Sequence, residues 1–340
     1  MSDNNAGTDE NLQVVIASMP DGPLEPSHFS IESGPIPEPG SGQVLCRTTA
    51  ITIGAGQRAG LQGSASYAGA PEVGGVMGGS GLAVVEASDV PGFTAGDLVR
   101  APTGWQTYSV QDPEKLALVA EPLDPAVLLG PFGTNGMTAY FGLMDVGNVA
   151  EGDTVVVSAA GGSVGHMVGQ MAKAAGARVV GVAGSDEKCA LLVEELGFDA
   201  AVNRRSDDFR AEFKAATPDR IDVYFDNTGG QILQSALFRM AVGGRIVCCG
   251  VASQYDTSTP AAGPRGVPGL LINNRVTMRG FLIYDYADRY EEARTAIAGW
   301  IDDGRLKPRV TTYEGLEAAP QAFVDLLAGT TVGTTVVLLN

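Results

Sequence analysis

The apolar positions between residues 153 and 183 follow three successive patterns. A run of valines at 155–157 is typical of a strand buried on both faces of a parallel sheet. Small residues fill positions 159–165, and a second valine-rich run follows at 178–183. Between them apolar residues recur at helical spacing, at Val164, Met167, Val168 and Met171, and Gly176 ends the helix. The order strand, turn, helix, strand predicts the first half of a dinucleotide-binding fold.

The turn carries a variant of the glycine fingerprint of such folds. Ala160 occupies the first glycine position, and Gly162 and Gly165 occupy the other two. The motif is weak alone, but here it follows a predicted strand and opens a predicted helix. Gly162 would let a pyrophosphate approach the backbone at the helix N-terminus, with contacts from residues 162–165 (Gly162, Ser163, Val164 and Gly165). The alternative is a turn whose glycines serve only helix–strand packing.

The rest of the chain shows two sequence patterns, one typical of strands and one typical of helices. Residues 12–129 contain short apolar runs broken by Gly and Pro, for example 13–17, 42–47 and 81–87, which predicts a compact barrel-like β domain. From residue 124 the pattern becomes helical, with Asn135 as a helix cap.

Further elements are expected after the second strand. They are a helix at 185–197 capped by Ser185 or Asp186, strands at 221–227 and 244–250 with a helix between them, a lid-like loop at 255–270, a strand at 274–284, a helix at 289–303, a strand at 307–312, and a final helix and strand within 316–340.

Composition narrows the function classes. The 340 residues, 44% of them apolar, suit about two domains. The formal charge of −17 without a basic cluster makes nucleic acid and anionic membranes poor partners. No apolar run has the length of a membrane span or resembles a signal peptide. Four cysteines without disulfide or metal-ligand spacing indicate a reducing cytoplasm.

Several motifs together resemble a known family. They lie at 136–143, 159–165, 184–188, 196–199, 225–230 and 249–255. In this order they resemble the medium-chain dehydrogenase/reductase superfamily, in its zinc-free branch of prostaglandin (leukotriene) reductases, curcumin reductases and plant double-bond reductases. The likeness covers residues 12–340.

The resemblance implies an α/β fold of two domains. A GroES-like β-barrel catalytic domain (12–130 and 310–340) would surround a Rossmann NADP-binding domain (131–309) built on a doubly wound parallel sheet, after a disordered tail (1–11). It also implies NADPH-dependent reduction of the C=C bond of small hydrophobic α,β-unsaturated ketones or aldehydes. A homodimer formed through the edge of the Rossmann sheet is expected, with the strand before Tyr284 as that edge.

The choice of cofactor is argued from the second strand. NAD enzymes place an acid at its end to bind the ribose 2′-hydroxyl, whereas residues 183–184 here are Ala and Gly. Lys188, Arg204 and Arg205 follow, and cations suit the 2′-phosphate of NADP(H). The resemblance implies a phosphate contact for Lys188, and Arg204 stands where relatives carry a tyrosine. Asp186 argues the other way unless it caps the helix, and Lys188 has the alternative of an ordinary solvated lysine.

The sequence argues against catalytic zinc, so no metal is expected. Such a site needs three protein ligands, and the chain has only His28 and His166. Where zinc relatives carry Gly-His-Glu, this chain has Gly79, Ser80 and Gly81.

Without a metal, hydrogen-bond donors must stabilise the developing enolate oxygen. Tyr255 matches a tyrosine of relatives that orients the carbonyl or the ribose and relays a proton. The alternative is that Tyr255 only packs the loop onto the cofactor. Other positions that the resemblance places along the cofactor are Asn227, Cys249, Gly250, Ser253, Phe281, Leu282, Ile283 and Thr331.

The largest departure from the relatives concerns the substrate pocket. Over residues 54–58 relatives read approximately Asp-Pro-Tyr-Met-Arg, and their tyrosine is replaced here by Gly56. Loss of the phenol would widen the pocket for a bulkier substrate, unless Tyr67 or Tyr284 refills the space. A carbonyl or quinone reductase on the same scaffold, and a non-catalytic NADPH-binding protein, are the alternative functions.

Overall fold

The computed structural model describes residues 10–63, 71–121, 123–257, 259 and 263–339. The chain forms two compact units. The first unit comprises Met1–Pro125, Thr312–Ala328 and Thr335–Asn340, and the second comprises Ala126–Thr311 and Gly329–Thr334. The short segment Gly329–Thr334 thus groups with the second unit, although all of 310–340 was expected in one domain.

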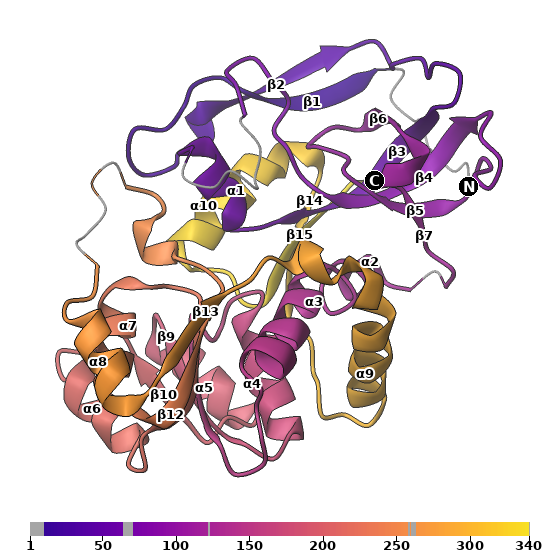
Figure 1. Cartoon of the computed structure of the whole chain (residues 1–340). Coiled ribbons are helices and arrows are strands. Elements are labelled where there is room, and N and C mark those ends of the chain that lie inside the picture. Colours follow the sequence, from indigo (N-terminus) through magenta and orange to yellow (C-terminus); the bar gives the residue numbers. More distant parts are fainter. Residues whose placement is uncertain (1–9, 64–70, 122, 258, 260–262, 340) are drawn as a thin grey trace. The chain divides into compact units, whose positions relative to one another are not determined.

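The second unit is built on a six-stranded sheet in which all neighbouring strands are parallel (Figure 1). Its order is β10-β9-β8-β11-β12-β13. The strands are β8 (Thr154–Ser158), β9 (Arg178–Ala183), β10 (Ala200–Asn203), β11 (Ile221–Asp226), β12 (Met240–Cys248) and β13 (Thr277–Gly280). Counted from β8, this is the 3-2-1-4-5-6 order of the Rossmann fold, which confirms the predicted doubly wound sheet.

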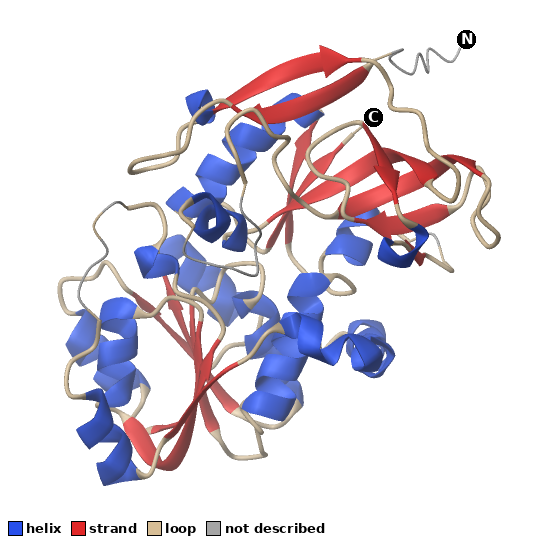
Figure 2. Cartoon of the chain, turned by 45° about the horizontal axis from the view of Figure 1, so that its top comes forward, coloured by secondary structure: helices blue, strands red, loops and turns tan. Residues whose placement is uncertain are grey.

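Alternation along the strands explains why helices cover both faces. Val155 and Val157 of β8 belong to one apolar cluster and Val156 belongs to another, because successive side chains point to opposite faces. The first cluster receives α3 (Thr134–Phe141), α4 (Gly165–Ala174), α5 (Asp186–Glu194) and α9 (Tyr290–Asp302). The second receives α6 (Phe209–Ala216), α7 (Gly230–Leu237) and α8 (Val267–Asn274). Figure 2 shows this layering of helices around the sheet.

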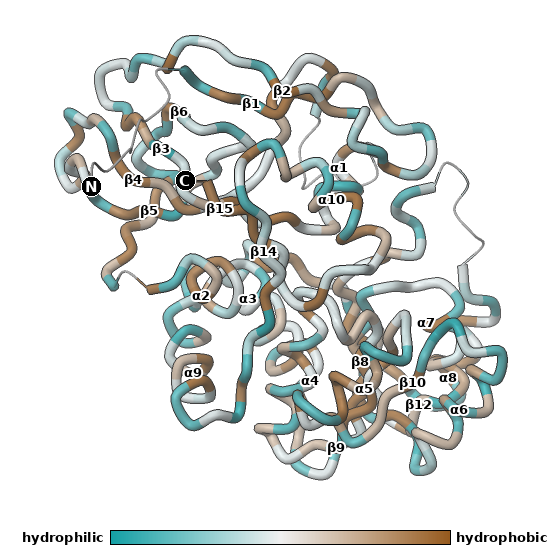
Figure 3. Tube along the Cα trace, turned by 180° about the vertical axis from the view of Figure 1, so that it is seen from behind, coloured by the Kyte–Doolittle hydropathy of each residue, from teal (hydrophilic) through white to brown (hydrophobic). Residues whose placement is uncertain are grey.

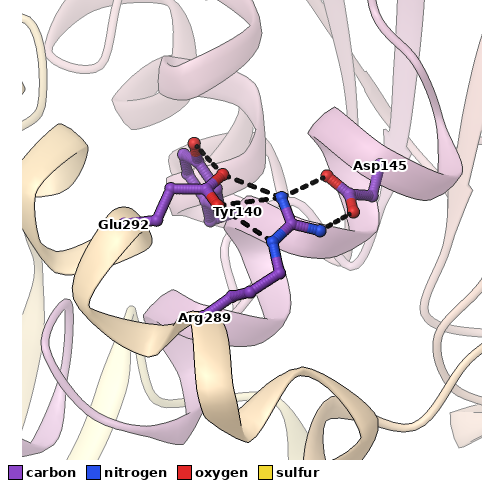
Figure 4. Close-up of polar contacts among 4 residues, drawn as sticks. All are labelled: Tyr140, Asp145, Arg289 and Glu292. Atoms are coloured by element: carbon purple, nitrogen blue, oxygen red, sulfur yellow. Dashed lines mark hydrogen bonds and ion pairs between the residues drawn. The ribbon is translucent and has the colours of Figure 1, made fainter.

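Helix α9 is amphipathic and is attached at its start by a polar cluster. It buries Ala293 and Ile297, and Figure 3 shows hydrophobic and hydrophilic residues alternating along it. Arg289, the last residue of the 3-10 helix η6 (Ile283–Arg289), pairs with Asp145 and with Glu292, whose carboxylate also accepts from the Tyr140 hydroxyl (Figure 4). These bonds connect α9 to the π-helical turn η4 (Gly142–Val146) and to α3.

The first unit is mostly antiparallel β structure. One sheet has the order β14-β15-β3-β4-β5-β7, with β6 paired to β3, and a separate hairpin joins β1 and β2. The strands are β1 (Asn11–Ile16), β2 (Phe29–Gly34), β3 (Val44–Ile53), β4 (Gly81–Ser88), β5 (Leu98–Ala101), β6 (Tyr108–Gln111), β7 (Ala117–Leu118), β14 (Val310–Glu314) and β15 (Thr334–Leu338). The short helices η1 (Pro26–His28), α1 (Gly56–Leu61), η3 (Pro113–Lys115) and η7 (Leu316–Ala318) and the longer α10 (Ala319–Ala328) accompany them, and α2 (Pro125–Leu129) begins at the boundary between the units.

Two local predictions were wrong, and the strand expected at 274–284 is shorter, because only Thr277–Gly280 forms β13. The expected loop at 255–270 ends early, because α8 begins at Val267 after Gly266, whose φ is +69°. Pro268 does not prevent the helix, since proline is tolerated in a first turn, where its missing N–H costs nothing. Asn135 is not the cap of α3, which begins at Thr134 after Gly133.

Candidate functional site: the nucleotide-binding turn and its cations

The turn between β8 and α4 is held by close backbone packing. Ala159 has a φ of +47°, and its carbonyl accepts from the Gly162 N–H at 2.9 Å. A Cβ at Gly165 would lie 2.4 Å from the Ala159 oxygen, so this position requires glycine. At Gly162 a Cβ would meet only that same oxygen, at 3.2 Å. Gly165 therefore serves helix–strand packing, whereas a Cβ at Gly162 would meet a single neighbour at a longer distance.

The start of α4 offers donors to an anion. The backbone N–H groups of Val164 and Gly165 have no acceptor among the described residues, and no acidic side chain lies in the first turn. Helix N-termini carry partial positive charge, and their first N–H groups lack partners within the helix. The start of α4 therefore offers these N–H groups to an anion such as a pyrophosphate, and the contact itself stays a prediction.

Three cations gather beyond the ends of β9 and β10. The Arg204 N–H donates to the Ala183 carbonyl at 2.9 Å, which brings Arg204 beside Gly184. Burial and the nearby guanidinium groups of Arg205 and Arg204 lower the pKa of Lys188. Burial and Arg205 likewise lower the pKa of Arg204. In the described part of the chain neither guanidinium pairs with a carboxylate, so the charge of this cluster is available to an anionic ligand.

Lys188 itself is already engaged. Its ammonium donates to the carbonyls of Gly329 and Thr331, at 2.6 Å each, and its methylene stem packs against Gly161. Thr331, a predicted cofactor contact, is thus placed at the cation cluster by its backbone. The alternative of a simply solvated lysine is wrong.

The segment after Gly329 also reaches the glycine turn. The Gly333 N–H donates to the Gly161 carbonyl at 2.9 Å, and the Ser163 hydroxyl donates to the Gly333 carbonyl at 3.1 Å. Gly162 and Gly333 form an isolated parallel bridge. We call residues Gly329–Thr334 the strap, and it lies along the predicted pyrophosphate contacts.

The role of Asp186 is resolved by the structure. Ser185 is the N-cap of α5, its hydroxyl accepting from the Lys188 N–H at 3.3 Å. Asp186 occupies the first turn and accepts from the side-chain amide of Asn203 at 2.8 Å. Its carboxylate is therefore committed to β10 and to the helix dipole, where negative charge is favourable.

The carboxyl ends of β11 and β12 assemble a second group of predicted residues. Asn227 donates its side-chain amide to the Ser158 carbonyl at 2.7 Å, which leaves its oxygen as the atom able to accept from a ligand. The N–H groups of Cys249 and Gly250 both donate to the Asp226 carbonyl, at 2.9 and 3.0 Å. Burial raises the pKa of the Cys249 thiol to about 12, so this sulfur stays protonated.

Asp226, which was not among the predicted site residues, organises this end of the sheet. Its carboxylate accepts from the N–H groups of Gly229 and Thr228, at 2.8 and 3.0 Å, and from the hydroxyls of Tyr224 and Ser158, at 3.0 and 3.2 Å. Burial raises its pKa while these donors act in the opposite direction. Asp226 could have been found from its position, because it is the last residue of a buried strand and ligand-binding loops follow the carboxyl ends of such strands.

The remaining predicted positions around the cofactor differ in environment. Ser253 donates its backbone N–H to the Thr228 carbonyl at 2.9 Å and lies in η5 (Ala252–Gln254), directly before Tyr255. The ring of Phe281 packs closely against Gly142: a Cβ added at Gly142 would lie 2.7 Å from the Phe281 Cζ atom.

After Phe281, burial varies along the chain. Ile283 is mostly buried in the core. Leu282 and Tyr284 are exposed to 41% and 63%.

The loop that carries Gly56 belongs to the first unit. Gly56 opens α1, and Gln57 fixes the loop by accepting from the Gly54 N–H at 2.8 Å and donating to the Gly78 carbonyl at 2.6 Å. Arg58 is fully buried and donates to the Gly22 carbonyl at 2.7 Å. Tyr67, the other predicted pocket residue, lies outside the described residues.

The chain does not fit a catalytic zinc of the dehydrogenase type. Both ring nitrogens of His166 are occupied by backbone groups of Gly162 and Arg309. A Cβ at Gly81 would lie 2.2 Å from the Ala50 carbonyl oxygen, so no ligand side chain can stand there. Across the described ranges, no three His, Cys, Asp or Glu side chains gather as a metal site.

Comparisons with known proteins agree with this geometry. Residues 163–299 match the family model described as zinc-binding dehydrogenase, and residues 12–119 match the N-terminal domain of oxidoreductase. The chain is 37% identical over 332 residues to an NADPH-dependent curcumin reductase of Escherichia coli, covering 96% of both chains. It is 40% identical over 267 residues to an NADP(+)-dependent 2-alkenal reductase of Nicotiana tabacum, covering 77% of both.

A solved structure is similar over nearly the whole chain. The crystal structure of CurA from Vibrio vulnificus in complex with NADPH superimposes with a TM-score of 0.92 at 37% identity. The match covers 97% of this chain and 99% of that one.

Proposed function

This chain belongs to the zinc-independent branch of the medium-chain dehydrogenase/reductase superfamily that contains the prostaglandin and curcumin reductases, and we propose that it reduces the C=C bond of α,β-unsaturated ketones and aldehydes with NADPH. Relatives named as curcumin, 2-alkenal and (+)-pulegone reductases, from a bacterium and from plants, support a reductase of this class.

The observation that carries the proposal is the cation cluster beside the glycine turn. Lys188, Arg204 and Arg205 lie where an NAD enzyme would present an acid, and no carboxylate in the described residues neutralises the two arginines. A 2′-phosphate placed there gains charge-assisted hydrogen bonds, and it relieves the mutual repulsion of the cations. The cofactor is therefore NADP(H), bound with its pyrophosphate against Val164 and Gly165.

The protein's own contribution is binding, orientation and proton supply. When bound, NADPH supplies the hydride that reaches the β-carbon of the enone. We assign the Tyr255 hydroxyl to the developing enolate, where it donates a hydrogen bond to the carbonyl or the ribose and relays the proton to the α-carbon. Residues Phe281, Leu282 and Ile283 would provide the apolar wall and backbone bonds beside the nicotinamide.

The substrate is a hydrophobic carbonyl compound, and Gly56, which replaces the tyrosine of the relatives, widens the pocket for a bulkier compound of this class. The Gln57 contacts to Gly54 and Gly78 hold the loop without the tyrosine of the relatives. A Gly56→Tyr variant should lose activity with bulky enones and keep activity with small ones. An unchanged preference across both classes would contradict the role of Gly56.

The decisive experiment is NADPH oxidation across a panel of enones, ketones and quinones, with identification of the products. A saturated ketone from a conjugated enone supports C=C reduction, and an allylic alcohol indicates carbonyl reduction. Activity confined to quinones indicates a quinone reductase. Tight NADPH binding without turnover of any compound would indicate a non-catalytic NADPH-binding protein.

We also propose a cytoplasmic homodimer whose first unit is the GroES-like catalytic domain and whose second unit binds the cofactor. The sheet of the second unit ends at β13, an exposed edge strand that could pair with its copy. None of the helices in the described part of the chain is long and apolar enough to span a membrane. Light scattering of wild-type protein and of a Met278→Pro variant, which removes a backbone donor from β13, tests the dimer.

A further inference from the structure

His166 is a fully buried histidine in the first turn of α4, with a partner at each ring nitrogen. Its Nδ1 lies 2.9 Å from the Gly162 carbonyl oxygen, and its Nε2 lies 3.1 Å from the Arg309 backbone nitrogen. The Arg309 N–H can only donate, so Nε2 must accept and Nδ1 must carry the hydrogen. This pairing assigns the neutral tautomer, and burial agrees with it by lowering the pKa of His166 to about 4.

The Gly162 carbonyl consequently receives two donors. The first is the imidazole Nδ1–H, and the second is the backbone N–H of His166 at 3.2 Å. A glycine peptide rotates with little steric resistance, so these two bonds, together with the bridge to Gly333, hold the orientation of the peptide between Gly162 and Ser163.

The orientation of that peptide decides where its N–H points. The described residues contain no cis peptide, and in a trans peptide the oxygen and the amide hydrogen point in opposite directions. With the Gly162 oxygen turned toward His166, the Ser163 N–H points away from the ring, to the side where Gly333 bridges the turn. The Gly162 oxygen therefore stays on the His166 side of the turn, and the groups left to an approaching phosphate are the N–H groups of Val164 and Gly165, which have no acceptor among the described residues.

We propose that His166 is a positioning residue for the cofactor pyrophosphate, acting through the Gly162 carbonyl. The inference rests on the proposed NADPH dependence and adds a residue that acts on the turn without touching the cofactor. Its Nε2 has a separate, structural task. The Nε2 atom holds the backbone of Arg309, just before the chain enters the first unit at Thr312. One turn further along α4, the side-chain oxygen of Gln170 accepts from the Lys307 N–H at 2.7 Å in the same way.

Two substitutions separate the tasks of the two nitrogens. In His166→Asn the amide nitrogen can occupy the place of Nδ1 and keep the bond to Gly162, while the contact with Arg309 is lost. In His166→Gln the longer amide can reach the place of Nε2 and accept from Arg309, while the donor to Gly162 is lost. Both variants are neutral and similar in size.

Binding is measured by calorimetry with two fragments of the cofactor, 2′-phospho-ADP-ribose and adenosine 2′-monophosphate, of which only the first contains a pyrophosphate. We expect His166→Gln to weaken the binding of 2′-phospho-ADP-ribose roughly tenfold, which is the upper range for the loss of one hydrogen bond. Its affinity for adenosine 2′-monophosphate should be unchanged. His166→Asn should bind both fragments within about twofold of wild type, the low end of a single hydrogen bond's effect, even if its Tm falls.

Other results would overturn the inference. One is wild-type affinity of His166→Gln for 2′-phospho-ADP-ribose. Another is an equal loss of that affinity in His166→Gln and His166→Asn. The third is an equal loss of affinity of His166→Gln for both fragments. If wild type binds 2′-phospho-ADP-ribose but turns over no enone, only the proposed reaction fails. If wild type binds neither fragment, the NADPH dependence and the inference fail together. His166→Met, which also lacks the donor, replaces His166→Gln should that variant not fold.

Discussion

Acidification should destabilise the protein through His166, even in the absence of cofactor. Burial of the imidazole lowers its pKa from 6.5 to about 4 in the folded protein. An unfolded chain binds a proton below pH 6.5, whereas the folded chain resists it until about pH 4. Between these values the unfolded state binds more protons, so the free energy of unfolding falls as pH falls. The contribution of His166 is complete above pH 6.5 and is lost on acidification.

The size of the effect follows from the two pKa values. Between pH 7 and pH 5 the unfolded histidine becomes almost fully protonated while the folded one stays almost neutral. Linkage then gives a loss of about 2 kcal/mol in the free energy of unfolding. This is a large part of the stability of a typical domain.

The assay is urea unfolding at pH 7 and pH 5, followed by circular dichroism, for wild type and His166→Gln. Other groups titrate in this range, among them Asp226, whose pKa is raised. Their effects are common to both proteins, and the difference between the proteins isolates His166. The stability advantage of wild type should shrink by about 2 kcal/mol at pH 5.

A constant difference between the two proteins at both pH values would refute the reasoning. It would mean that the folded imidazole accepts a proton as readily as the unfolded one. The neutral tautomer that binds Gly162 and Arg309 would then be wrong as well.

Three further predictions test the cofactor site and the fold. Arg204→Ala should raise the KM for NADPH roughly tenfold and leave that for NADH unchanged, because it removes a charged partner of the 2′-phosphate. Steady-state kinetics with both cofactors checks this. Gly165→Ala should destabilise the protein by about 1–3 kcal/mol, because its Cβ would lie 2.4 Å from the Ala159 oxygen; urea unfolding measures it, with Gly162→Ala, which has more room, as the milder comparison. Arg289→Gln should lower the Tm slightly, because it breaks the pairs with Asp145 and Glu292, and added salt should shrink the difference from wild type. A salt-independent difference would contradict the electrostatic explanation.

Much of the second unit could be predicted because its signals are local. The valine-rich runs at 154–158 and 178–183 are typical of strands buried on both faces, and the small residues at 159–165 allow a tight turn before the helix. The absence of an acid at 183–184 is an equally local signal, and it favours NADP(H) over NAD. Short elements such as β10 and α6 were not predicted. A strand of only a few residues, such as β10, carries too little pattern to be distinguished from a loop.

The sequence by itself determined the fold class, the glycine turn and the kinds of charge near it. Only the tertiary structure decided the partners of those charges. Lys188 binds the carbonyls of Gly329 and Thr331, more than a hundred residues away, and His166 binds the backbone of Arg309 at a similar separation. No periodicity encodes such pairs, because they exist only after the sheet has formed and has brought the strap and the glycine turn together. The local pattern therefore predicts the elements, and packing assigns each polar group its partner.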